Sequence, residues 1–195
     1  MALSRIHLIA GLGNTGPDYV DTRHNAGAWL VERFAALQKQ DLSYSSKFQG
    51  YTAKVILDNE LCHLLIPTTF MNLSGQAVSA VAHFYKIEPK NMLIVHDELD
   101  LAPGTARLKL SGGHGGHNGL RDIFNALDSH DFYRLRIGIG KPTTPMDVAD
   151  YVLQKPSKAE FELINNSIDR ALALMPQIIA GQIDAAMKAL HTKES

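Results

Sequence analysis

Residues 5–16, RIHLIAGLGNTG, decide the fold, because an apolar run passes there into a turn with three glycines. We expect a buried strand over 5–12 and a tight turn over 11–16. The apolar residues that follow recur at helical spacing and predict a helix over residues 26–39, capped by Thr22. A strand, a turn and a helix in this order are typical of an α/β protein.

Periodicity and turn residues place the remaining elements. They comprise a hairpin of strands over 51–57 and 61–66, a helix over 73–85 capped by Ser74, a buried strand over 92–96, strands over 107–110 and 133–139 around a helix over 120–127, and a helical tail from Ser157. In the tail, Ser157 and Glu160 form a capping box, Pro176 is expected to kink or end the helix, and Gly181 precedes a last helical piece that ends near Leu190. The sequence therefore predicts one α/β domain over residues 1–195, with a twisted mixed β-sheet flanked by helices and a helical C-terminal tail.

Composition narrows the class of protein. The chain has 195 residues, of which 45% are hydrophobic and 20% charged, so it resembles an ordinary soluble domain rather than a disordered or disulfide-rich chain. A net charge of -1 excludes a globally basic nucleic-acid coat protein but permits a local basic surface. The single cysteine, Cys62, lies in an apolar stretch and is expected to be a buried thiol in the reducing cytoplasm. No segment approaches the roughly 20 apolar residues that span a membrane.

Two patterns suggest cofactors but are weak. The glycines of residues 11–16 satisfy GxGxxG, yet the acidic residue of a dinucleotide site, expected about 20 residues on, would fall inside the predicted helix. His114 and His117 have metal-ligand spacing, and His96 with Asp97 could add ligands. A glycine loop places such ligands poorly, so a metal-dependent hydrolase is an alternative rather than the main reading. The serine-hydrolase elbow G-x-S-x-G is absent.

Polar residues at loop positions form a more informative set. They are Asn14, His24 with Asn25, Asn72, Asp97, and His117 with Asn118. A neutral amide offers both a donor and an acceptor, so asparagines suit the orientation of an uncharged ester or amide and the stabilisation of an oxyanion. Their shared placement at loop positions predicts one site.

Four motifs carry a resemblance to a known family. They are residues 19–27 (YVDTRHNAG), 69–75 (TFMNLSG), 96–100 (HDELD) and 113–122 (GHGGHNGLRD). Together and in this order they resemble bacterial peptidyl-tRNA hydrolases, strongly over residues 5–140 and in the tail only by length and helical character. The resemblance implies a monomeric α/β enzyme, without metal or cofactor, that hydrolyses the ester joining a peptide to the 3′-terminal ribose of tRNA and so recycles the tRNA.

The resemblance also implies roles for residues at matching positions. His24 is the general base and Asp97 the carboxylate that holds it. Asn14 selects blocked over free amino termini, and the substrate channel is lined by Tyr19, Phe70 and Met71. Asn72 and Asn118 contact the substrate and position the water, and His117 also binds the substrate. Lys109 and Arg136 contact tRNA phosphate. Two departures from the family pattern are Thr15, in place of a proline, which would loosen Asn14, and Pro176, which leaves the shape of the lid region open.

The residues suit this chemistry on physical grounds. Histidine has an ordinary pKa of about 6.5, so it is mostly neutral at cellular pH, and a nearby helix N-terminus would disfavour the His24 cation. Asp97 would act in the opposite direction and fix the tautomer. Residues 105–141 carry six basic and three acidic residues, a local excess that suits RNA phosphate if the side chains share a face. The alternative hypothesis to a hydrolase is a catalytically inert RNA-binding module.

Overall fold

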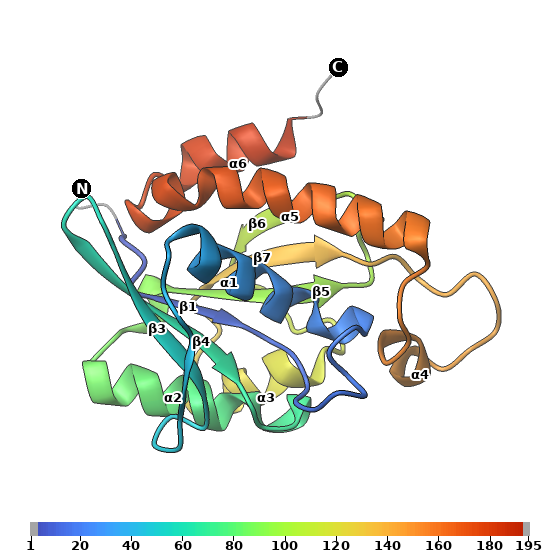
Figure 1. Ribbon diagram of the computed structural model, residues 1–195, viewed down its shortest axis with the longest axis horizontal. Coiled ribbons are helices and arrows are strands. Elements are labelled where there is room, and N and C mark those ends of the chain that lie inside the picture. The colour runs from blue at the N-terminus through green and yellow to red at the C-terminus, as the bar shows by residue number, and fades with distance from the viewer. Residues whose placement is uncertain (1–3, 193–195) are drawn as a thin grey trace.

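A seven-stranded sheet organises the chain (Figure 1). It is described here from a computed structural model that covers residues 4–192, so the ends of the predicted domain, 1–3 and 193–195, lie outside the described residues. The strands are β1 (Leu8–Gly11), β2 (Ser43–Ser45), β3 (Gly50–Leu57), β4 (Glu60–Pro67), β5 (Met92–Glu98), β6 (Ala106–Leu110) and β7 (Tyr133–Gly138). Their order in the sheet is β2-β3-β4-β1-β5-β7-β6. Strands β4, β1, β5 and β7 are parallel, while β2, β3 and β6 pair antiparallel at the edges, which confirms the mixed sheet.

Helices cover both faces of the sheet (Figure 1). On one face lie α1 (Ala26–Leu37), α5 (Lys158–Ile179) and α6 (Ile183–His191); on the other lie α2 (Ser74–Tyr85) and α3 (Asn118–Leu127). A short helix, α4 (Val148–Val152), stands beyond the strand ends toward which the arrows of β5 and β7 point. Among the described residues, no helix is both long and apolar enough to cross a membrane.

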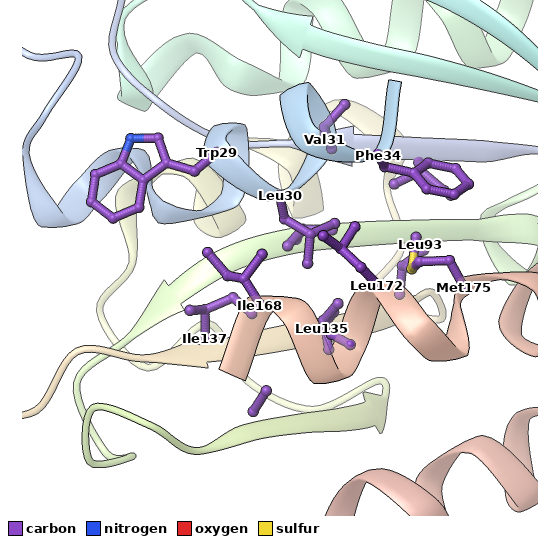
Figure 2. Close-up of a cluster of buried hydrophobic side chains, with 14 of the residues drawn as sticks. Trp29, Leu30, Val31, Phe34, Leu93, Leu135, Ile137, Ile168, Leu172 and Met175 are labelled. Atoms are coloured by element: carbon purple, nitrogen blue, oxygen red, sulfur yellow. The ribbon is translucent and has the colours of Figure 1, made fainter. Parts of the chain in front are cut away.

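Alternating residues of the central strands build two cores. Leu93 and Val95 of β5 face α1 and α5, whereas Met92 and Ile94 of the same strand face α2 and α3. Figure 2 shows the first of these clusters, in which side chains of α1 and α5 meet over Leu93 of β5 and over Leu135 and Ile137 of β7. Burial on both faces explains why the parallel strands read as continuous apolar runs. Cys62 is buried and free, as predicted, and burial raises the pKa of its thiol.

Two glycines allow α1 to approach the sheet closely. A Cβ atom on Gly27 would lie 2.1 Å from the carbonyl oxygen of Val95, and one on Gly11 would lie 2.4 Å from the carbonyl oxygen of Gly27. Only residues without side chains permit this contact between the start of α1, β1 and β5. The close packing of α1 therefore explains why Gly11 of the GxGxxG pattern is a glycine. The same contact brings the residues before α1 to the end of β5.

Two predicted helix caps are wrong. Thr22 does not cap α1, because a one-turn 3₁₀ helix, η1 (Arg23–Asn25), precedes it and the Thr22 hydroxyl donates to the carbonyl of Tyr19. Ser74 is the first residue of α2 rather than its cap, and its hydroxyl donates to the carbonyl of Met71 in the preceding 3₁₀ helix, η2 (Met71–Leu73). In both places an extra turn occurs where the sequence predicted a direct start of the helix.

The C-terminal tail largely follows the prediction. The capping box of Ser157 and Glu160 begins α5. The helix does not end at Pro176 but three residues later, in the last turn, where a proline removes a single backbone hydrogen bond. Gly181 adopts a positive φ of 82° and separates α5 from α6, as expected. Besides η1 and η2, three further short elements were not predicted: β2, α4 and the 3₁₀ helix η3 (Pro89–Asn91).

Candidate active site

Two adjoining cavities lie at the carboxyl ends of β1 and β5. The first, the catalytic cavity, has a volume of about 400 Å³ and is lined by His24, Asp97, Glu98, Leu99, Gly115, Gly116, His117, Asn118, Val148, Ala149 and Val152. The second, the apolar cavity, has a volume of about 370 Å³ and is lined by Asn14, Tyr19, His24, Phe70, Met71, Asn72, Asn118, Ala149, Val152 and Leu153. They share His24 and Asn118, so the two cavities form one cleft around these side chains. Nine of the eleven predicted site residues line it; Lys109 and Arg136 do not.

His24 and Asp97 form the central pair of the cleft. The Nδ1 atom of His24 lies 2.9 and 3.0 Å from the two carboxylate oxygens of Asp97, and both residues are buried. Since a carboxylate only accepts, His24 must carry its proton on Nδ1. Among residues 4–192, its Nε2 atom has no hydrogen-bond partner and is left as a proton acceptor facing the cleft.

His117 is the second donor to Asp97. Its Nε2 atom lies 2.9 Å from Oδ1 of Asp97, while its Nδ1 atom accepts from the backbone N–H groups of Gly119 and Leu120 at the start of α3. Because Nδ1 accepts, the proton must sit on Nε2, and the ring is a neutral donor. Both nitrogens of His117 are therefore used within the protein, which makes the ring a support for Asp97.

The charge of Asp97 controls the titration of this pair. Burial alone would raise the pKa of Asp97, but the two histidines that donate to it outweigh burial and hold that pKa well below its usual range. Burial also lowers the pKa of His24, and the charge and hydrogen bond of Asp97 more than reverse this effect, so the pKa of His24 lies above its usual value.

Asn14 is held by three hydrogen bonds. Its backbone N–H donates to Oδ1 of Asn25 at 2.8 Å, its carbonyl accepts from Nδ2 of Asn25 at 2.9 Å, and its side-chain Oδ1 accepts from the N–H of Met71 at 2.7 Å. Thr15 takes part in none of these bonds. The contact with Met71 orients the amide so that its NH₂ group is the side free to donate to a ligand.

The other predicted cleft residues divide into polar and apolar groups. Asn72 in η2 and Asn118 at the start of α3 are exposed, and within the described chain neither side-chain amide has a hydrogen-bond partner. Tyr19, Phe70 and Met71 provide the apolar wall, and Phe70 leaves 60% of its surface exposed. The cleft therefore offers unused amides beside exposed apolar surface.

Helix α4 forms a wall that the sequence did not predict. Its residues Val148, Ala149 and Val152 line the cleft, and Arg23, next to His24 in the chain, fastens the helix in place. The buried guanidinium of Arg23 donates to the carbonyl of Tyr151 at 3.1 Å, lies 4.0 Å above the Tyr151 ring, and pairs with Glu160 of α5 at 3.1 Å. A signal for α4 was present in Asp147, whose side chain caps the helix, followed by apolar residues four apart.

Lys109 and Arg136 lie outside the cleft, on one face of the β6–β7 pair. The antiparallel register sets Arg107 opposite Arg136 and Lys109 opposite Arg134, and directly opposed residues share a face. Like charges opposite each other destabilise a sheet unless something neutralises them. Glu98 pairs with Arg136 at 2.7 Å, which leaves Arg107, Lys109 and Arg134 of this basic face without an ion pair among residues 4–192.

The predicted metal ligands do not come together as proposed. In the described part of the chain, the one group of suitable donors is His24, Asp97 and His117, whose donor atoms lie within 4.8 Å of one another. These atoms already form hydrogen bonds, because His24 and His117 both donate to Asp97. The other ring nitrogen of His117 accepts from the N–H of Gly119 in α3. His114 instead accepts from the N–H of Gly116, and His96 bonds the carbonyl of Asp97, while burial lowers its pKa to about 3. The alternative based on His114 and His117 therefore lacks its geometry.

The fold and the cleft define a small single-domain α/β protein in which a histidine, paired with a carboxylate, faces an apolar, amide-lined cleft. The family model described as peptidyl-tRNA hydrolase matches residues 8–195. The chain belongs to the peptidyl-tRNA hydrolase family. It is 50% identical over 194 residues to the peptidyl-tRNA hydrolase of Pseudomonas entomophila, covering 99% of this chain and 100% of the relative, and 52% identical over 186 residues to that of Methylococcus capsulatus, covering 95% and 99%. The crystal structure of peptidyl-tRNA hydrolase from Acinetobacter baumannii superposes with a TM-score of 0.94 at 44% identity, covering 100% of this chain and 98% of that one.

Proposed function

We propose that this protein hydrolyses the ester between a peptide and the 3′-terminal ribose of tRNA, with His24 as the general base. One observation carries the proposal: Asp97 fixes the proton of His24 on Nδ1, and this leaves Nε2 to accept a proton in the cleft. We also propose that the enzyme acts as a monomer, as the family resemblance implies. The free, buried thiol of Cys62 suits the reducing cytoplasm, where we place the activity.

The proposed reaction needs one water and returns one proton. Nε2 of His24 takes a proton from water while the water oxygen bonds to the ester carbon, giving a tetrahedral oxyanion and an imidazolium. Asp97 stabilises that imidazolium. The carbon–oxygen bond to the ribose then breaks, His24 returns the proton to the ribose oxygen, and the products are a peptide carboxylic acid and tRNA with a free hydroxyl.

The asparagines of the cleft orient the water, the oxyanion and the substrate carbonyl, which His24 does not do. Asn118 lines both cavities beside His24, so its amide is placed to orient the water or the oxyanion. Asn72 lies on the other wall of the apolar cavity and can hold the substrate carbonyl. His117 acts through Asp97, since both of its nitrogens have partners, and we assign it a positioning role.

The direct test of this function is a product analysis. We expect the protein to convert N-acetylaminoacyl-tRNA into intact tRNA and the N-acetyl amino acid over many turnovers. In water enriched in oxygen-18, one label should enter the released carboxylate and none the tRNA hydroxyl. Binding of tRNA without turnover would favour the inert RNA-binding module instead.

The activity should have an acidic limb set by His24. The neutral imidazole is the active form and Asp97 raises the pKa of His24, so activity falls as the pH drops through a midpoint above the ordinary value of about 6.5. The measurement is kcat/KM for N-acetylaminoacyl-tRNA from pH 5 to 9. A midpoint below the ordinary histidine value would contradict the role of Asp97.

Asn14 should set the preference for blocked amino termini. Its NH₂ group can donate to a neutral acyl group but gives no compensation to an ammonium, whose burial is costly. Asn14→Asp keeps an acceptor for the N–H of Met71 and places a carboxylate oxygen where the NH₂ group stood. We expect the ratio of kcat/KM for N-acetylaminoacyl-tRNA over free aminoacyl-tRNA to narrow by about tenfold. An unchanged ratio would remove Asn14 from this role.

Lys109 should contribute to tRNA affinity through phosphate. Its side chain is exposed on the basic face of β6 and β7. Lys109→Ala should reduce the slope of log Kd against log salt by about 1, the effect of losing one phosphate contact. Lys188→Ala, an exposed lysine on α6, is the matched control and should leave the slope unchanged. Equal slopes for all three proteins would place the phosphate contacts elsewhere.

A further inference from the structure

We infer that a third cavity, beside Asn14, holds the second and third residues of the peptide. This distal cavity has a volume of about 290 Å³. It is lined by Gly13, Asn14, Thr15, Gly16, Pro17, Val20, Asn25, Ala28, Glu32, Tyr51, Ile66, Pro67 and Thr68. The inference rests on the proposed function and assigns the part of the substrate that the cleft around His24 does not accommodate.

The distal cavity continues the cleft. Asn14 lines both the apolar cavity and the distal cavity, so the two meet at this side chain. Two consecutive residues also line the two cavities, since Tyr19 lines the apolar cavity and Val20 lines the distal cavity. A peptide that leaves the apolar cavity past Asn14 therefore enters the distal cavity.

The order of strands gives the substrate a direction. The sheet order runs β3-β4-β1-β5-β7-β6. The basic face lies on β7 and β6, the His24–Asp97 pair at the end of β5, and the distal cavity at the ends of β1 and β4 and beside β3. With tRNA phosphate on the basic face and the ester at His24, the peptide must extend toward β1 and β4.

The lining suits peptides of varied sequence. The carboxylate of Glu32 is the one charged side chain among the residues that line the distal cavity, and the rest are glycine, proline, apolar and neutral polar residues. In the turn over residues 13–17, both backbone groups of Asn14 and the carbonyl of Gly16 already have partners. Among residues 4–192, the backbone groups of Thr15 and the N–H of Gly16 have none and can pair with a peptide main chain whatever its side chains. An extended chain advances about 3.5 Å per residue, so a one-residue acyl group stops short of a cavity that a tripeptide would enter.

The test compares two lengths of substrate. Val20→Trp adds an indole at a position that is 45% exposed in the lining of the distal cavity, and Thr15→Trp fills the same cavity from the turn as a second variant. The substrates are N-acetylaminoacyl-tRNA and N-acetyl-tripeptidyl-tRNA. We expect the ratio of kcat/KM, tripeptidyl over aminoacyl, to fall about fivefold to tenfold in both variants.

Ile56→Trp is the matched control. It adds the same indole at a position that is 69% exposed on β3, outside the lining of all three cavities, and should keep the wild-type ratio. A ratio unchanged in Val20→Trp and Thr15→Trp, or an equal loss on both substrates, would overturn the inference. Wild-type protein that hydrolyses neither substrate would instead refute the proposed function, so the two failures are distinguishable.

Discussion

His24→Ala should lose about 10³-fold in kcat toward N-acetylaminoacyl-tRNA while it binds tRNA with nearly unchanged affinity. The imidazole is placed to take a proton from water, since its Nδ1 atom is bonded to Asp97 and its Nε2 atom has no hydrogen-bond partner among residues 4–192. The tRNA contacts that we propose lie on β6 and β7, away from His24. The measurements are single-turnover rates and the dissociation constant for tRNA at fixed salt.

His130→Ala is the control for this substitution, because His130 is an exposed histidine outside the cleft. It should retain the wild-type rate. A His24→Ala protein that is folded, binds tRNA and still hydrolyses the ester at a near-normal rate would show that another group activates the water.

Asp97→Asn is expected to have the second largest effect, a loss of about 10²-fold in kcat. The carboxylate accepts from both His24 and His117, each at 2.9 Å. Both rings bond Oδ1, and Oδ2 lies 3.0 Å from Nδ1 of His24, so an amide whose oxygen replaces Oδ1 keeps the bond from His117 and presents its NH₂ group to Nδ1 of His24. His24 is then free to hold its proton on Nε2, the wrong tautomer for a base.

The same variant should shift the acidic limb. Without the negative charge the imidazolium is less stable, so the pKa of His24 falls and the residual activity should persist to lower pH than in the wild type. Asp100→Asn is the matched control, since Asp100 belongs to the same motif but forms an exposed ion pair with Lys141. If the midpoint of the acidic limb lay at the same pH in Asp97→Asn and in the wild type, a group other than His24 would determine that midpoint.

Local sequence patterns were enough to predict the central elements. Strands β1 and β5 are buried on both faces, so their apolar runs are unbroken, and the capping box at Ser157 identifies the start of α5. Thr22 and Ser74 misled because both are good N-cap residues by type, whereas their hydroxyls bond to carbonyls of preceding turns. Residue type alone does not reveal that a 3₁₀ turn intervenes.

The site required more than local patterns. His24 and Asp97 lie 73 residues apart in the chain, and they meet because Gly27 allows α1 to lie against β5. No periodicity predicts that contact; the motifs of a family do. The wall formed by α4 escaped prediction because five residues give little periodicity, and its docking depends on Arg23, whose partners lie more than 100 residues away.

We propose that His24, held by Asp97, activates the water that cleaves the ester of peptidyl-tRNA. The most direct measurement is peptide release from peptidyl-tRNA by the wild-type protein and by His24→Ala, each with and without a metal chelator. We expect the wild-type protein to release all of the peptide in the presence of chelator, and His24→Ala to release almost none. Loss of wild-type activity in chelator, or release by His24→Ala at the wild-type rate, would contradict it.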